Sequence, residues 1–225
     1  PKVFIKREVV LTPEQLRAYE DMKTMALALF DQGMTTTVNA LTQLMRLHQI
    51  TCGHTKLDDG TEINIPTNRV TEMMSVVEET SGKVIIWAGY RHDIESIKLA
   101  LQKEYGMAAV GTYYGDTDDE ERRRVVREFQ DMDSELRFFV GNPRTGGYGL
   151  TLTAASTVVY FSNSFDLEVR LQSEDRAHRI GQTKSVTYVD LFVAGTIDEK
   201  IVKALRAKID IANEVLGEEM KNWLI

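Results

Sequence analysis

The chain has little cysteine, no long apolar run and no signal-peptide pattern in its first residues, and these shortages bound the class of protein to expect. Cys52 is the one cysteine among 225 residues, so no disulfide can form within the chain, which fits a reducing, intracellular setting. No apolar stretch approaches the ~20 residues of a membrane-spanning helix, so no membrane partner is expected. The start at Pro1 rather than methionine favours a piece of a longer protein.

An excess of positive charge is also missing. The formal net charge is −7, the wrong sign for a protein that coats nucleic acid through its overall field. Any contact with nucleic acid must therefore come from cations gathered on one surface. The length allows one sizeable core with an appendage, or two small domains.

The first 66 residues predict a small helical segment. An extended strand over 3–11 leads to Thr12, Pro13 and Gln15, which have the spacing of a capping box with proline at the first helical position. Apolar residues at helical spacing then predict one helix that ends at Gly33, and a second helix after it. Residues 51–67 are polar and rich in turn formers, which favours a loop or a short hairpin.

From residue 67 to residue 225, strands and helices alternate. The predicted strands are 83–88, 108–112, 136–140, 157–161 and 186–193; the predicted helices are 68–80, 93–105, 117–129 (capped by Thr117), 167–179 and a last one capped by Thr196. This alternation predicts an α/β fold, a parallel sheet with helices on both faces over 67–225, preceded by the helical lead-in over 1–66. In such folds the functional residues gather at the carboxyl ends of the strands.

The helix over 167–179 carries the first candidate chemistry. Gln172, Arg176 and Arg179 recur on one face of it. Two guanidinium groups on one face repel, so a partner must compensate them. Solvent is the usual partner of exposed arginine. The alternative is a polyphosphate, whose oxygens match the guanidinium fork. Spacing alone leaves both interpretations open.

The second candidate is a glycine-rich stretch that follows the strand over 136–140. Glycines at a strand's carboxyl end let backbone N–H groups approach an anion, and Arg144 and Thr145 would add to such a site. An ordinary glycine-rich turn is the simpler interpretation. The stretch is not a Walker A loop, because no Gly-Lys-Ser/Thr follows it.

Taken in order, these motifs resemble the Swi/Snf-type branch of superfamily 2 helicases and translocases. The stretch 146–155 is similar to motif V of that family, and 172–182 is similar to motif VI nearly letter for letter. The stretch 195–201 resembles the closing Gly-Thr-(Ile/Val)-Glu-Glu-Lys-Ile run, and 83–90 resembles motif IV. The resemblance implies the second RecA-like domain of a two-domain motor.

The resemblance also implies roles for particular residues. Arg176 and Arg179 would be catalytic and reach the γ-phosphate of ATP across an interdomain cleft, with Arg179 as an arginine finger. The implied ATP-binding residues are Gln172, Gly147 and Gly149. The implied DNA-binding residues are Arg144, Thr145, Gly146 and Arg122.

By the same resemblance, ATP and Mg²⁺ bind mainly to a first RecA-like domain that this chain lacks. The chain alone is then expected to bind neither and to be inactive, and its partners would be that domain and double-stranded DNA. Residues 164–167 depart from the family's usual Asp-Trp-Asn-Pro. That departure and the acidic charge slightly favour the alternative of a non-catalytic DNA- or protein-binding module, but the intact Gln172, Arg176 and Arg179 weigh against it. No metal site is predicted, because His48, Cys52 and His54 lack a fourth ligand.

Overall fold

The computed structural model describes residues 1–31, 37–57, 59–145, 150–179, 185–209, 211 and 222–223. The chain forms two compact units, one built on a sheet and one built from helices. The sheet unit comprises Pro1–Arg7, Val70–Ser164 and Glu168–Leu191, and the helical unit comprises Glu8–Arg69, Phe165–Leu167 and the described part of Phe192–Ile225. Each unit is made of segments that lie far apart in the sequence, whereas the sequence predicts a single division at residue 66.

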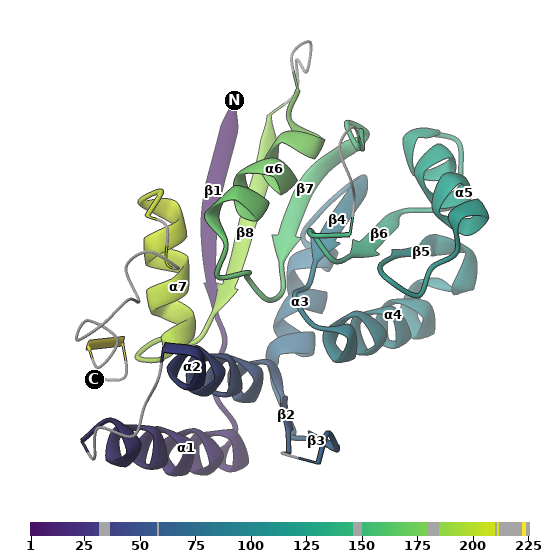
Figure 1. Ribbon diagram of the computed structural model, residues 1–225. Coiled ribbons are helices and arrows are strands. Elements are labelled where there is room, and N and C mark those ends of the chain that lie inside the picture. The colour runs from purple at the N-terminus through teal and green to yellow at the C-terminus, as the bar shows by residue number, and fades with distance from the viewer. Residues whose placement is uncertain are drawn as a thin grey trace. The chain divides into compact units, whose positions relative to one another are not determined.

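Six strands form the sheet, in the order β1-β8-β7-β4-β6-β5 (Figure 1). Their bounds are β1 Lys2–Glu8, β4 Lys83–Trp87, β5 Val110–Tyr113, β6 Phe138–Gly141, β7 Ala155–Tyr160 and β8 Val186–Phe192. Strand β4 pairs in parallel with both β6 and β7, and the β5–β6 and β7–β8 pairs are parallel as well. This central place explains why β4 is apolar after Lys83: all five of its residues are buried.

Helices cover both faces of this sheet. They are α3 Arg69–Glu78, α4 Arg91–Tyr105, α5 Asp119–Gln130 and α6 Leu167–Ala177, with a short 3₁₀ turn η1 at Met107–Ala109. Successive strand residues point to opposite faces, so Phe138 packs against Tyr105 of α4 while Phe139 packs against Phe129 of α5. Helix α6 shares the core of α5 through Ala177. The predicted parallel sheet with helices on both faces is confirmed.

The start of α5 differs from the prediction. Asp118, rather than Thr117, caps the helix, because its Oδ1 accepts a hydrogen bond from the N–H of Glu121 at 2.8 Å. The hydroxyl of Thr117 is engaged by the preceding loop, where it accepts from the N–H of Tyr114 and donates to the carbonyl of Thr112.

The helical unit contains α1 Pro13–Asp31, α2 Thr37–Cys52, α7 Ile197–Arg206 and a hairpin of β2 His54–Lys56 and β3 Glu62–Asn64. The capping box is confirmed: the N–H of Thr12 donates to Gln15 Oε1 and the N–H of Gln15 donates to Thr12 Oγ1, both at 3.2 Å. The hairpin interpretation of residues 51–67 is also confirmed, and the predicted helix end at Gly33 lies outside the described residues. No helix in the described part of the chain is long and apolar enough to cross a membrane.

A buried ion cluster ties the helical unit together. The Asp198 carboxylate, fully buried at the start of α7, accepts hydrogen bonds from Arg69 Nη2 and from the N–H of Val193. His48 of α2 places its Nε2 3.4 Å from Asp198 Oδ1. Burial alone raises the pKa of Asp198, but the charge of Arg69 and the hydrogen bond from His48 outweigh burial and hold that pKa below its usual value.

Candidate functional site

The loops that leave β4, β5, β6 and β7 meet at one edge of the sheet, because parallel strands end on the same side. The chain order reverses around β4, with β6 and β5 on one side of it and β7 and β8 on the other. Ligands of open α/β sheets bind at such a switch point. Direct hydrogen bonds join these loops: the N–H of Gly89 donates to Ser162 Oγ at 2.8 Å, and Asn142 Nδ2 donates to the carbonyl of Gly89 at 3.1 Å.

The helix predicted over 167–179 is shorter in the structure: α6 ends at Ala177, so Gln172 and Arg176 lie on the helix and Arg179 does not. Gln172 is exposed and donates to Glu168 Oε1 at 2.8 Å. Arg179 lies just beyond the helix, is exposed, and donates to Thr151 Oγ1 at 2.9 Å and to the carbonyl of Leu150 at 3.3 Å. Both acceptors are neutral, and the segment that supplies them directly follows the glycine-rich stretch. The structure thus brings Arg179 of motif VI against Leu150 and Thr151 of motif V.

Arg176 is far more enclosed, with 6% of its surface exposed. Burial is the largest influence on its pKa and lowers it; the nearby phenol of Tyr113 opposes this, while the like charge of Arg179 adds to it, and the net shift is downward. The group remains charged at neutral pH, because an arginine starts from a pKa above ~12. A cation that is penalised by burial and by a like neighbour gains when an anion binds beside it.

The predicted DNA-binding residues after β6 lie at the same edge of the sheet. Arg144 is exposed; its N–H donates to Asn142 Oδ1 at 2.9 Å and its Nη2 donates to Ser164 Oγ at 3.3 Å. Thr145 is half-buried and its N–H donates to the carbonyl of Asn142. The predicted positions Gly146, Gly147 and Gly149 lie outside the described residues.

Arg122 has a different setting. Its guanidinium lies over the ring of Tyr113, with 5.5 Å between its Cζ and the ring centroid. Nη2 donates to the carbonyls of Tyr114 at 2.9 Å and Gly115 at 3.2 Å. The side chain therefore holds the loop that leaves β5. In the same loop, Asp116 forms an exposed ion pair with Arg91 at 2.6 Å.

Sequence reasoning missed the residues that join these loops, namely Asn142, Ser162, Asn163, Ser164 and Arg170. Arg170 is the most buried cation of α6, and the spacing of Arg170 and Glu174 was a visible signal for an ion pair within one helix. The other partners of Arg170 come from β8 and from the turn after β7, and no local pattern points to them.

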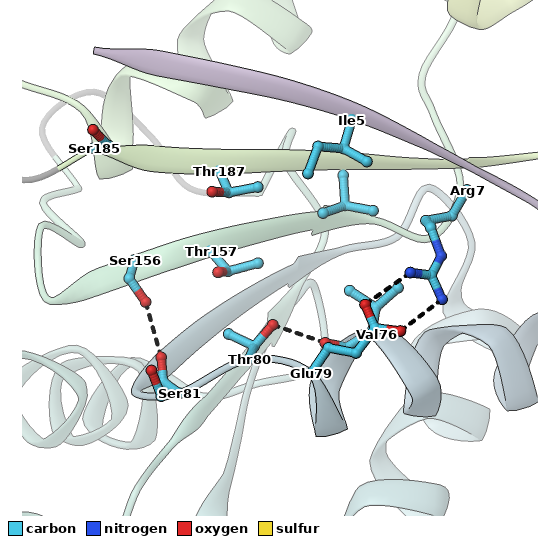
Figure 2. Close-up of a pocket in the computed structure, with 11 residues that line it drawn as sticks. Ile5, Arg7, Val76, Glu79, Thr80, Ser81, Ser156, Thr157, Ser185 and Thr187 are labelled. Atoms are coloured by element: carbon cyan, nitrogen blue, oxygen red, sulfur yellow. Dashed lines mark hydrogen bonds and ion pairs between the residues drawn. The ribbon is translucent and has the colours of Figure 1, made fainter.

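The sheet unit also has a cavity of about 360 Å³, and Figure 2 shows the residues that line it. Hydroxyl groups line it at the amino-terminal ends of the strands, with Ser81 before β4, Ser156 at the start of β7 and Ser185 before β8. Arg7, the cation among the described residues that line it, is paired with Glu72 and with Glu79. The cavity therefore contributes nothing to the arginine site at the opposite ends of the strands.

Comparison with known proteins points to the same class of protein as the fold does. The family described as "Helicase conserved C-terminal domain" matches residues 67–181. The putative ATP-dependent helicase/translocase YwqA of Bacillus subtilis is 29% identical over 235 residues, which cover 99% of this chain and 24% of YwqA. The human chromatin-remodeling ATPase INO80 is 38% identical over 122 residues, 53% of this chain and 8% of INO80.

Two solved structures extend the likeness to three dimensions. The Sulfolobus solfataricus SWI2/SNF2 ATPase core in complex with dsDNA has a TM-score of 0.78 at 25% identity, over 100% of this chain and 50% of that one. The C-terminal domain of the Sulfolobus ATPase has a TM-score of 0.71 at 23% identity, over 98% of its own length, and shows the fold alone.

The chain belongs to the family of helicase conserved C-terminal domains, which are RecA-like parallel α/β domains. Within superfamily 2 its relatives place it in the Snf2 branch, as motifs V and VI predict. It spans a quarter or less of the length of the two curated relatives named above.

Proposed function

We propose that this chain is the second motor domain of an ATP-dependent translocase on double-stranded DNA. The observation that carries the proposal is the exposed guanidinium of Arg179, which has only neutral oxygens as partners among the described residues and lies beside the nearly buried Arg176. The relatives support it, since YwqA is named a putative ATP-dependent helicase/translocase and the Sulfolobus core was solved with dsDNA.

These residues fit the terminal phosphate of ATP. A guanidinium fork matches phosphate oxygens and stabilises charge on a phosphoryl group in transfer. Arg179 and Arg176 would take this role, with Gln172 on the same helix face and Gly147 and Gly149 in the adjoining stretch. Mg²⁺-bound ATP, held mainly by a first RecA-like domain, supplies the phosphoryl chemistry. Hydrolysis would then depend on closure of the two domains.

The DNA contacts would come from the loop after β6. Arg144 is exposed there, next to Thr145 and Gly146, and an arginine so placed neutralises a backbone phosphate without reading sequence. Arg122 would act by holding the loop after β5 in place for the same strand. Such local contacts are compatible with the acidic whole-chain charge.

The lone, buried Cys52 supports an intracellular setting.

Replacement of Arg179 in the complete protein tests the proposal. Arg179→Ala is expected to lower ATP turnover by about 10³-fold or more, the usual scale for an arginine finger. Arg123→Ala, an exposed arginine of α5, is the matched control and should leave turnover unchanged. Turnover of Arg179→Ala equal to that control would remove Arg179 from catalysis.

The chain by itself gives a second test. Without a first RecA-like domain it should show negligible ATP hydrolysis, and robust DNA-stimulated hydrolysis by this chain alone would contradict the two-domain mechanism. The alternative of a non-catalytic binding module is not favoured, because the matched relatives are named as ATP-dependent enzymes or ATPases.

A further inference from the structure

Arg170 lies on the inner side of α6, with 3% of its side chain exposed. Its Nε donates to Glu174 Oε1 at 2.8 Å, and its Nη1 donates to Asp190 Oδ1 of β8 at 2.5 Å. The guanidinium carbon also lies 3.6 Å from the centroid of the Tyr160 ring on β7. One side chain therefore joins α6 to two neighbouring strands of the sheet.

The charged groups around Arg170 restrict the orientation of α6. Burial by itself lowers the pKa of Arg170, but the neighbouring Tyr160, Asp190 and Glu174 outweigh burial and raise it above its usual value. Buried ion pairs often add no more stability than apolar residues of the same size would, because desolvation offsets their attraction. A planar fork with two anchored carboxylates nevertheless permits few orientations of the helix that carries it.

Arg170 also reaches the turn that follows β7. Its Nη1 donates to Asn163 Oδ1 at 2.7 Å, and Asn163 Nδ2 donates to Asp190 Oδ1 at 3.3 Å. Asn163 is 3% exposed. Asn163 thus belongs to the same buried hydrogen-bond network as Arg170 of α6.

The turn over 162–164 is held on its other sides by the loops of the DNA-facing edge. Ser162 Oγ accepts from the N–H of Gly89 and donates to Asp93 Oδ2 at 2.6 Å. Ser164 Oγ accepts from Arg144 Nη2. A continuous series of polar contacts therefore runs from Arg144 through this turn to Arg170.

We propose that Asn163 and Arg170 are positioning residues that couple a DNA contact at Arg144 to the placement of Arg176 and Arg179. The inference rests on the proposed function and deepens it. A phosphate drawn to Arg144 competes with its contact to Ser164, the turn over 162–164 adjusts, and the Arg170 fork passes that adjustment to α6. Two sites coupled in this way influence each other through a shared free energy.

Asn163→Ala in the complete protein is the direct test. It removes the link to the turn and leaves the ion pairs of Arg170 with Asp190 and Glu174 in place. We expect DNA-stimulated turnover to fall by about 5-fold or more, the lower end of measured coupling effects. Basal turnover and DNA affinity should stay within about 2-fold, the spread seen for independent sites.

Lys2→Met is the matched control. Lys2 Nζ contacts Glu174 at 3.1 Å and Asp175 at 2.9 Å, so it belongs to the ion network of α6, but both of these partners lie on the helix. It should leave stimulation unchanged. Arg170→Lys keeps the buried charge and loses the guanidinium fork. We expect it, like Asn163→Ala, to lower DNA-stimulated turnover and to keep basal turnover. It replaces Asn163→Ala as the test if that variant does not fold.

A second measurement needs no nucleotide. Duplex DNA alone should slow hydrogen exchange of the α6 amides in the unaltered protein and in Lys2→Met, and should not slow it in Asn163→Ala. Equal loss of basal and stimulated turnover would assign Asn163 a purely structural role and overturn the proposal. Normal stimulation in Asn163→Ala, with turnover abolished in Arg179→Ala, would overturn this inference and leave the motor function standing.

Discussion

Asp198→Asn is the substitution from which we expect the largest loss of stability in the helical unit. Asparagine keeps the shape of the side chain and an oxygen that can accept from the N–H of Val193, so the change removes mainly one charge. Arg69 would keep its own charge while fully buried, and its Nε would still donate to the neutral carbonyl of Thr51 at 3.2 Å.

The size of the effect follows from that burial. Breaking a buried ion pair on one side costs about 3–5 kcal/mol, because the other charge is left uncompensated in a low dielectric. Domains unfold at about 5–15 kcal/mol, so this is a large share of the total. With a urea dependence of ~2 kcal/mol per molar, the unfolding midpoint should fall by about 1.5–2.5 M.

The assay can follow the helical unit by itself. Of the two tryptophans, Trp87 lies in the core of the sheet unit and Trp223 packs against the core of the helical unit. In a Trp87→Phe background, urea denaturation followed by fluorescence therefore reports on the helical unit. Lys203→Met, which removes half of a solvent-exposed ion pair with Glu199 on α7 of the same unit, is the control and should cost no more than about 1 kcal/mol.

The pH dependence gives an independent check. Because the folded-state pKa of Asp198 is depressed, its contribution to stability is present above the unfolded pKa of about 4 and is lost as the pH falls through the folded value. Asp198→Asn should therefore flatten the acid limb of the stability curve. If Asp198→Asn cost no more than Lys203→Met and left the acid limb unchanged, the reasoning on the buried cluster would be refuted.

Three further substitutions test other parts of the molecule. Arg144→Ala should weaken binding to all duplex sequences alike and lower the salt slope by about 1; a sequence-dependent loss in binding titrations would contradict a phosphate contact. Thr12→Ala should cost about 1 kcal/mol in urea denaturation through loss of the α1 cap, and a neutral result would deny the capping box an energetic role. Gly141→Ala should cost about 1–3 kcal/mol, because its Cβ would lie 2.6 Å from the Tyr113 carbonyl oxygen and 3.2 Å from Trp87; unchanged stability would mean that the end of β6 can shift.

The amino-acid sequence by itself determined the local elements and the class of fold. The apolar run of β4, the Thr12–Gln15 capping box and the alternation of strands and helices are set by side-chain polarity and by hydrogen bonds between near neighbours. Motif VI predicts Arg176 and Arg179 as site residues, but only Arg176 lies within α6, because the helix ends at Ala177. Where local signals competed, as between Thr117 and Asp118 at the start of α5, the sequence pointed to the wrong residue.

Tertiary structure alone decided how these arginines are held. Arg170 finds Asp190 and Asn163 only because β7 and β8 are neighbours in the sheet, and Asp198 finds Arg69, 129 positions away, in the same manner. Burial then sets the direction of the pKa shift at Arg176, which no spacing of residues contains. Charges far apart in sequence interact strongly only when folding removes the water between them, and that removal is a property of the assembled fold.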